Sequence, residues 1–179
     1  WNALEHRERM CMLAVTEGVE FSFADLKRPQ KQERRIAEIL DEVPADSPSW
    51  SRMDGLKAKE ERDKEAGKGF AMQILTERDM KCPTITKGYA KVRSTDPKLQ
   101  HPSNPDLLRQ FTPAEHARLK GIPEQLVNGL SATIAHELLG QSICYEPFLA
   151  VASLIGETLK NVSIDKPQQA EAMPLQLVG

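Results

Sequence analysis

The run Thr-Pro-Ala-Glu at residues 112–115 constrains the fold most, because it specifies where a helix begins. Threonine three residues before glutamate forms a capping box, in which each side chain accepts a hydrogen bond from the other residue's backbone N–H, and proline suits the first helical position. Gly121 favours the end of this helix and Pro123 prevents its restart. The sequence therefore predicts one short helix over residues 113–120.

Two further helices are predicted after this one. Residues 131–139 predict a helix that Gly140 would end, and Pro147 suits the first turn of the next. Apolar side chains at helical spacing follow this proline and predict one buried face: Phe148, Val151, Ala152, Ile155 and Leu159. We expect the three predicted helices to pack as a small bundle within residues 107–160.

The first residues predict β structure instead. Residues 10–16 form a continuous apolar run, which is typical of a strand buried on both faces. Residues 21–23 predict an edge strand, and residues 70–75 predict a further strand. We expect the strands near the N-terminus to belong to a truncated sheet with an exposed apolar edge. The predicted fold class is therefore α+β, with irregular structure between these strands and the helical bundle.

The charge balance restricts where nucleic acid could bind. A formal net charge of −2 over 179 residues excludes a globally basic surface, so a nucleic-acid site must be local. Residues 81–98 form the clearest basic patch, with five basic residues and one acidic residue, Asp96.

The cysteines and the hydropathy point to a cellular compartment. Cys11, Cys82 and Cys144 are far apart and form no C-x-x-C pair, which argues against a disulfide scaffold or a zinc site and favours a reducing environment. No apolar run approaches the roughly 20 residues of a membrane helix. We expect a soluble, cytoplasmic protein that does not contact a membrane and binds no metal.

Residues 109–123 resemble one sequence block of the DNA cytosine-5 methyltransferase family. The family's ninth block has the form R-x-L-T-x-x-E-x-x-R-L-x-G-F-P. Seven of its defined positions carry the family's residue here: Arg109, Thr112, Glu115, Arg118, Leu119, Gly121 and Pro123. Phe111 and Ile122 are mild replacements within the same block.

Three further segments follow the order of the family's blocks. Residues 6–9, His-Arg-Glu-Arg, resemble the eighth block, although Glu5 stands where the family prefers Gln. Residues 140–143, Gly-Gln-Ser-Ile, resemble the tenth block, G-N-S-V, with Gln in place of Asn. Residues 83–89 resemble the recognition loop with its Thr-Leu or Thr-Ile pair. The resemblance covers about residues 5–160.

The resemblance also implies a domain organisation. Residues 1–23 would end the catalytic-domain sheet, and residues 24–108 would form the variable target-recognition domain. Residues 109–160 would be the helical part that returns to the cofactor domain, and residues 161–179 a polar tail.

The activity implied is transfer of a methyl group from S-adenosylmethionine to C5 of a cytosine flipped out of double-stranded DNA, as in restriction-modification systems. The family's cofactor loop, its Pro-Cys nucleophile and its Glu-Asn-Val segment are missing from these 179 residues. We therefore expect no catalytic residue in this chain, which opens at Trp1 like a fragment. The N-terminal catalytic domain would lie on the same polypeptide or on a split subunit, and the chain alone would be inactive.

The resemblance assigns roles to particular side chains. Arg7 and Arg9 would hold the target cytosine or the DNA backbone, because guanidinium donors are fixed and always charged. Gln141 and Ser142 would approach S-adenosylmethionine. The candidate DNA-reading loop supplies Thr84, Ile85, Thr86, Lys87, Tyr89, Lys91 and Arg93. Each assignment has a plainer alternative: solvated arginines beside a strand, helix capping, and an ordinary surface loop.

Other polar residues are expected to be structural. Glu115 and Arg118 lie one helical turn apart and are predicted to pair, with Arg109 nearby. His116 and His136 have no further ligand at metal spacing and are interpreted as ordinary helix residues.

Two alternative functions remain open at this point. One is a DNA-binding module without enzyme activity, and the other is the DNA-binding subunit of a split methyltransferase. Residues 112–160 carry three basic and five acidic residues, which argues against a recognition helix and so against the first.

Overall fold

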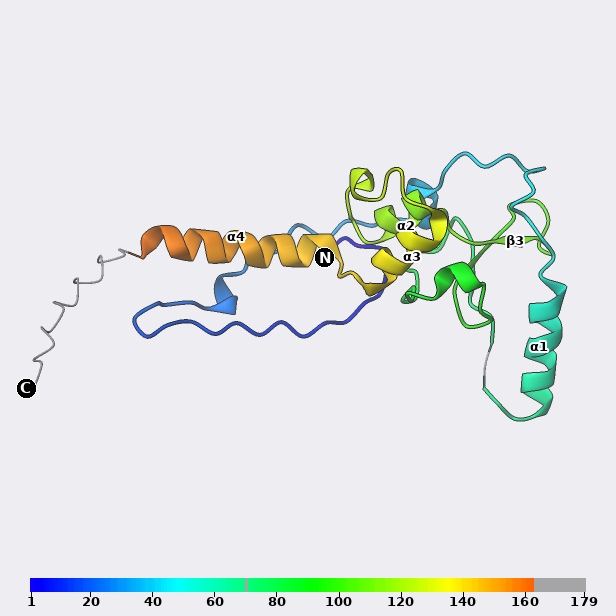
Figure 1. Ribbon diagram of the computed structural model, residues 1–179, viewed down its shortest axis with the longest axis horizontal. Helices are drawn as coiled ribbons and strands as arrows, with labels where there is room; N and C mark the ends of the chain where they lie inside the picture. Colours follow the sequence, from blue (N-terminus) through cyan, green and yellow to red (C-terminus); the bar gives the residue numbers. More distant parts are fainter. Residues whose placement is uncertain (70, 163–179) are drawn as a thin grey trace, which may run out of the picture.

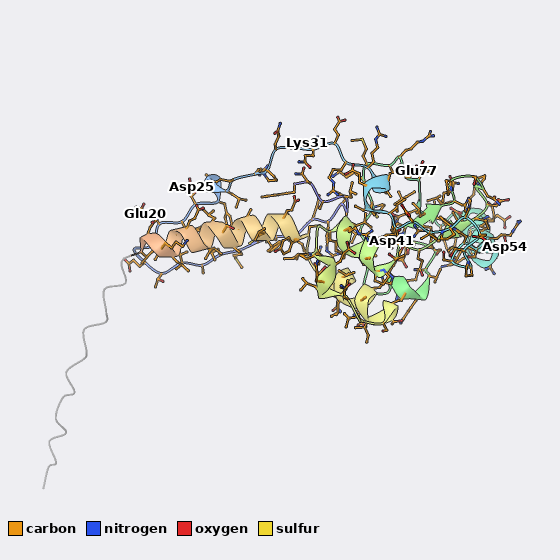
Figure 2. All side chains as sticks on the ribbon, turned by 90° about the horizontal axis from the view of Figure 1, so that it is seen from above. Glu20, Asp25, Lys31, Asp41, Asp54 and Glu77 are labelled. Carbon is orange, nitrogen blue, oxygen red and sulfur yellow. The ribbon has the colours of Figure 1, made fainter. Side chains whose placement is uncertain are left out.

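The computed structural model describes residues 1–69 and 71–162. A compact body holds most of the secondary structure, and helix α4 (Tyr145–Asn161) extends from it as a long arm (Figure 1). The segment that leads from the N-terminal region to the turn at Phe23–Asp25 runs out beside α4, and the polypeptide then returns to the body (Figure 1). Figure 2 shows Glu20 and Asp25 along this arm and Asp54 at the far end of the body.

Three very short strands form one sheet in the body. Strand β1 (Ile74–Leu75) pairs in parallel with β2 (Lys98–Gln100), which pairs antiparallel with β3 (Leu108–Arg109). The register places Leu75 opposite Leu99, and Leu99 opposite Arg109. The confirmed fold class is thus a mixture of helix and a small sheet.

The helices of the body differ in how much surface they bury. Helix α1 (Asp54–Glu65) is charged and has no buried residue, whereas α2 (Pro113–Leu119) and α3 (Ala132–Gln141) each bury one face. Four 3-10 turns complete the described elements: η1 (Phe23–Asp25), η2 (Ile36–Ile39), η3 (Tyr89–Lys91) and η4 (Glu124–Leu126).

The main core joins segments that are distant in the sequence. It is formed by buried side chains from the N-terminal segment, η2, the sheet, the 82–89 loop and α2: Leu4, Ile36, Ile39, Leu75, Cys82, Ile85, Tyr89, Leu99, Phe111 and Leu119. A smaller cluster lies between α2 and α3 and contains Ala117, Val127, Ala135 and Leu139. The main cluster packs the 82–89 loop against α2, and the smaller cluster packs α2 against α3.

The capping box at residues 112–115 is confirmed. The Thr112 hydroxyl accepts from the Glu115 N–H at 3.1 Å, and the Glu115 carboxylate accepts from the Thr112 N–H at 2.8 Å. The two later helices also form, but α3 continues through Gly140 to Gln141, and α4 begins two residues before Pro147. The predicted buried face of α4 is wrong: none of its residues is buried and Leu159 is 61% exposed, because α4 extends from the body instead of packing in a bundle (Figure 1).

The predicted strands near the N-terminus are wrong. Residues 10–16 form no strand, and the side chains of Met10 and Met12 are 92% and 89% exposed. Phe23 begins the turn η1 instead of ending an edge strand. A strand buried on both faces needs neighbours on its edges and above its faces, and the described residues supply none here. Of the strand predicted over 70–75, residue 70 lies outside the described residues, and within 71–75 only β1 forms.

No single helix within residues 1–69 and 71–162 is long and apolar enough to cross a membrane. Helices α3 and α4, which meet at an angle of 54°, reach that length and composition only when they are taken together. The tail predicted from residue 161 lies outside the described residues after Val162.

Candidate nucleic-acid interface

The 82–89 loop lies directly against the N-terminal segment. Cys82 donates its N–H to the Leu4 carbonyl at 2.9 Å, and the Cys82 carbonyl accepts from the His6 N–H at 2.7 Å. The Thr84 hydroxyl then donates to the His6 carbonyl at 2.6 Å. Residues that resemble the family's eighth block therefore border the candidate DNA-reading loop.

Two charged side chains hold the main chain of Ile85. Its N–H donates to the Glu5 carboxylate at 3.1 Å, and its carbonyl accepts from the Arg7 guanidinium at 3.4 Å. Arg7 also donates to the Gly140 carbonyl at 2.9 Å, so it connects the loop to α3. The side chain of Arg7 is buried, and it faces the protein interior instead of the surface where DNA would bind.

Glu5, Arg7 and Lys120 form a buried cluster of charges. The Lys120 ammonium lies 2.6 Å from one Glu5 oxygen, and Arg7 lies 3.3 Å from the other. Burial lowers the pKa of Lys120, and the adjacent Glu5 carboxylate opposes that shift. A buried charge is stable only where an opposite charge pairs with it. Glu5 is therefore needed as the counter-charge for both Arg7 and Lys120.

Gly140 permits a close approach between α3 and the loop. A Cβ atom added at this position would lie closer than 3.0 Å to backbone atoms of Thr86 and Lys87. Only a glycine fits such an approach without moving the main chain of the loop. The glycine of the segment resembling the tenth block is therefore explained by packing against the candidate loop.

The loop exposes some of its predicted DNA-reading side chains and buries others. Thr84, Thr86 and Lys87 are exposed, and Lys91 and Arg93 are exposed further along. Thr86 and Lys87 therefore lie at the surface on one side of the buried Ile85, and on the other side lies Thr84, whose hydroxyl donates to the His6 carbonyl.

Ile85 and Tyr89 belong to the core. Both side chains are fully buried. The Tyr89 hydroxyl donates to the Pro97 carbonyl at 2.8 Å and accepts from the Phe111 N–H at 2.9 Å, while burial raises the pKa of this phenol well above its usual range. In this structure the two side chains anchor the loop in the core and are not accessible to DNA.

The remaining predicted site residues lie on both sides of this junction. Arg9 is exposed, and its guanidinium donates to the Glu8 carbonyl at 2.6 Å. The Ser142 hydroxyl donates to the Leu139 carbonyl at 2.7 Å, which is the helix-capping alternative. Gln141 is exposed and reaches the Glu137 carbonyl at 3.4 Å.

A histidine pair beneath the loop was not predicted. His116 and His136 are buried with their Nδ1 atoms 3.1 Å apart, and both rings lie beside Tyr89. Burial lowers the pKa of His116 to about 2 and that of His136 to about 4, and for His116 the Lys120 charge adds to the effect. Among the described residues, no group of three side chains suits a metal ion.

Only a weak signal in the sequence pointed to the buried charges that were missed. Glu5 directly follows an apolar Leu4, and a charged residue in such a position suggests a buried partner. Nothing in the sequence identifies that partner as Lys120, because the two are brought together only by the packing of α2 on the N-terminal segment.

Comparison with known proteins identifies relatives of this chain. No protein-family profile matches it. It is 28% identical over 160 residues to the Type II methyltransferase M1.ScrFI of Lactococcus lactis subsp. cremoris. The matched region covers 87% of this chain and 40% of that protein. It is 31% identical over 164 residues to the Type II methyltransferase M.SsoII of Shigella sonnei, with 87% of this chain and 41% of that protein covered.

A solved structure supports the same relationship at the level of the fold. The S. pombe Dnmt2 methyltransferase matches with a TM-score of 0.61 and 23% identity, over 78% of this chain and 49% of that chain. The chain thus spans less than half the length of these proteins. It belongs to the DNA (cytosine-5-)-methyltransferase family and corresponds to the C-terminal part of its members.

Proposed function

We propose that this chain is the DNA-recognition part of an enzyme that transfers a methyl group to C5 of a cytosine flipped out of duplex DNA. The observation that carries the proposal is the clamped loop at residues 84–87. Its main chain is fixed through Ile85, while Thr84, Thr86 and Lys87 face the solvent. A fixed backbone with projecting polar side chains suits the reading of base edges.

Each exposed side chain of the loop suits a different DNA contact. A threonine offers a hydroxyl group and a methyl group to base edges, and a lysine contacts guanine or a phosphate. Arg9 would hold the backbone or the flipped cytosine, because its guanidinium lies exposed at the start of the arm. Extrusion of a base costs a few kcal/mol, so these contacts must stabilise the opened duplex.

S-adenosylmethionine supplies the methyl group when it is bound. Gln141 fits a position at the edge of that site, because its amide is exposed at the end of α3. The Ser142 hydroxyl donates within the helix cap and keeps its acceptor capacity for a ligand. The catalytic cysteine and the main cofactor loop come from the catalytic half of the enzyme.

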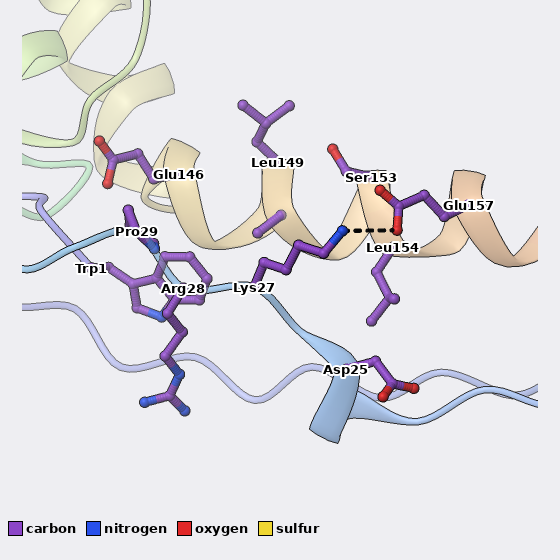
Figure 3. A pocket seen from close by; sticks show the side chains of 11 residues that line it. Trp1, Asp25, Lys27, Arg28, Pro29, Glu146, Leu149, Ser153, Leu154 and Glu157 are labelled. Carbon is purple, nitrogen blue, oxygen red and sulfur yellow. Dashed lines mark ion pairs between the residues drawn. The ribbon is translucent and has the colours of Figure 1, made fainter.

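The surface of the arm around α4 is a candidate binding surface for that catalytic half. Exposed apolar side chains extend along both of its segments: Met10, Met12, Val15, Phe23, Leu149 and Leu159. A cavity of about 430 Å³ lies between α4 and residues 25–29. Figure 3 shows Lys27 beside Glu157 at this cavity, with Nζ and Oε2 3.6 Å apart. Apolar surface of this extent marks an interaction site.

We infer that the catalytic half covers this arm, whether it lies on the same polypeptide or on a separate subunit. Such an enzyme acts on DNA in the cytoplasm.

The function is tested by combining this chain with the catalytic half and supplying duplex DNA and labelled S-adenosylmethionine. The expected product is 5-methylcytosine, identified by mass spectrometry of the digested DNA, and neither half alone should produce it. Transfer to another base, or undiminished transfer by the catalytic half alone, would contradict the proposal. Sequence-specific DNA binding without any methyl transfer would favour a non-enzymatic module.

A further inference from the structure

We propose, on the basis of the function above, that Glu5 is a positioning residue that sets DNA sequence specificity by fixing the main chain of the recognition loop at Ile85. Glu5 does not itself reach the exposed face of the loop. It acts through Ile85, which among residues 84–87 is the one whose side chain is in the core.

Contacts to the backbone N–H, the carbonyl and the side chain of Ile85 together fix its position. Glu5 accepts from its N–H at 3.1 Å, Arg7 donates to its carbonyl at 3.4 Å, and its side chain is fully buried. Exposure alternates around it, since Thr84 and Thr86 face outward. A slip of the loop by one residue would bring one of the two threonines into the buried position and move Ile85 outward, so the anchor at Ile85 determines which side chains meet DNA.

The Glu5 carboxylate is itself held by two cations. Lys120 lies 2.6 Å from one oxygen, and Arg7 lies 3.3 Å from the oxygen that also accepts from Ile85. All three side chains are buried. A carboxylate held in this way has little freedom to follow a displaced loop, which makes it a rigid acceptor.

A pair of double variants separates the hydrogen bond from the charge. Both Glu5→Gln with Lys120→Met and Glu5→Met with Lys120→Met remove one anion and one cation, so the cluster keeps its net charge of +1 from Arg7. The glutamine retains an oxygen that accepts from the Ile85 N–H. The methionine has a similar length and offers no comparable acceptor.

The measurement is methylation of duplex DNA with randomised flanks by the complete enzyme, comparing rates on preferred and other sequences. The Glu5→Met double variant should lose roughly tenfold in this discrimination, which is within the range of one base contact. The Glu5→Gln double variant should retain it. Equal loss in both variants, or full retention in both, would contradict the positioning role.

The wild-type enzyme distinguishes this inference from the proposed function. Absence of methylation by the wild type would contradict the function, whereas methylation with unaltered discrimination in both variants would contradict only the role of Glu5. Amide hydrogen exchange of the wild type keeps the proposal testable even where a variant does not fold. The Ile85 amide should exchange slowly, as a buried hydrogen bond requires, and exchange as fast as that of an exposed loop amide would contradict the clamp.

Discussion

Arg109 and Glu115 form a bidentate, buried ion pair with N–O distances of 2.6 and 2.7 Å. The same carboxylate accepts from the main-chain N–H of Asp41 at 2.8 Å, so it joins β3, the end of η2 and the start of α2. The predicted pair between Glu115 and Arg118 is wrong. Arg118 lies at the edge of the body and pairs with Asp41 and Glu124, because its side chain points away from the core that receives Glu115.

Removal of the Glu115 charge should destabilise the fold strongly. Glu115→Gln would leave Arg109 buried without a counter-charge, and breaking a buried pair in this way costs about 3–5 kcal/mol. Glu38→Gln is the matched control, because Glu38 pairs with Arg34 at the surface and should matter little. Urea unfolding measures both variants. A similar small effect of the two substitutions would show that the buried pair does not hold these elements together.

The histidine pair should make the protein less stable in mild acid. Burial keeps the pKa of His136 at about 4 and that of His116 at about 2, below the ordinary value of 6.5. As pH falls below 6.5, the unfolded chain takes up protons that the folded chain excludes, so stability falls by up to about 1.4 kcal/mol per pH unit for each histidine.

Denaturant unfolding between pH 7 and pH 4.5 measures this loss. The matched variant is His136→Phe, which removes one of the two groups and should flatten the dependence on pH. An unchanged slope in that variant would assign the acid sensitivity to the carboxylates instead.

Gly140→Ala should destabilise the junction between α3 and the loop. The added methyl group meets backbone atoms of Thr86 and Lys87, and overpacking of this kind costs about 1–3 kcal/mol. Gly156→Ala in α4 provides the comparison, because no atom lies within 4 Å of its added Cβ and alanine favours a helix by about 0.5–1 kcal/mol. Thermal unfolding should therefore shift in opposite directions, and a shift in the same direction would contradict the close approach.

The sequence predicted those elements that depend on local interactions. The helix at residue 113 was predicted correctly because its capping box involves only residues 112–115. The family resemblance pointed to residues 84–87 as a DNA-reading loop; Thr84, Thr86 and Lys87 are exposed there, and their contact with DNA stays a prediction.

The elements that were missed depend on partners distant in the sequence. Residues 10–16 carry the pattern of a buried strand, but a strand forms only where another strand supplies hydrogen bonds. The partners of Glu115 and Glu5 are chosen by tertiary packing, so the spacing of charges along a helix did not identify them. Arg7 is a residue type that commonly contacts DNA, yet its two terminal nitrogens donate to Glu5, Ile85 and Gly140 inside the protein.

Methylation by the complete enzyme over randomised flanks tests the central claim, which is that residues 84–87 read the DNA sequence. Thr86→Ala and Lys87→Ala should relax sequence preference by roughly tenfold or more, since a good base contact discriminates by about 1–3 kcal/mol. Arg9→Ala should slow methylation of every sequence about equally, because a contact to phosphate or to the flipped cytosine is independent of the flanks. A shift of preference in Arg9→Ala, together with only a uniform change of rate in the loop variants, would contradict the account.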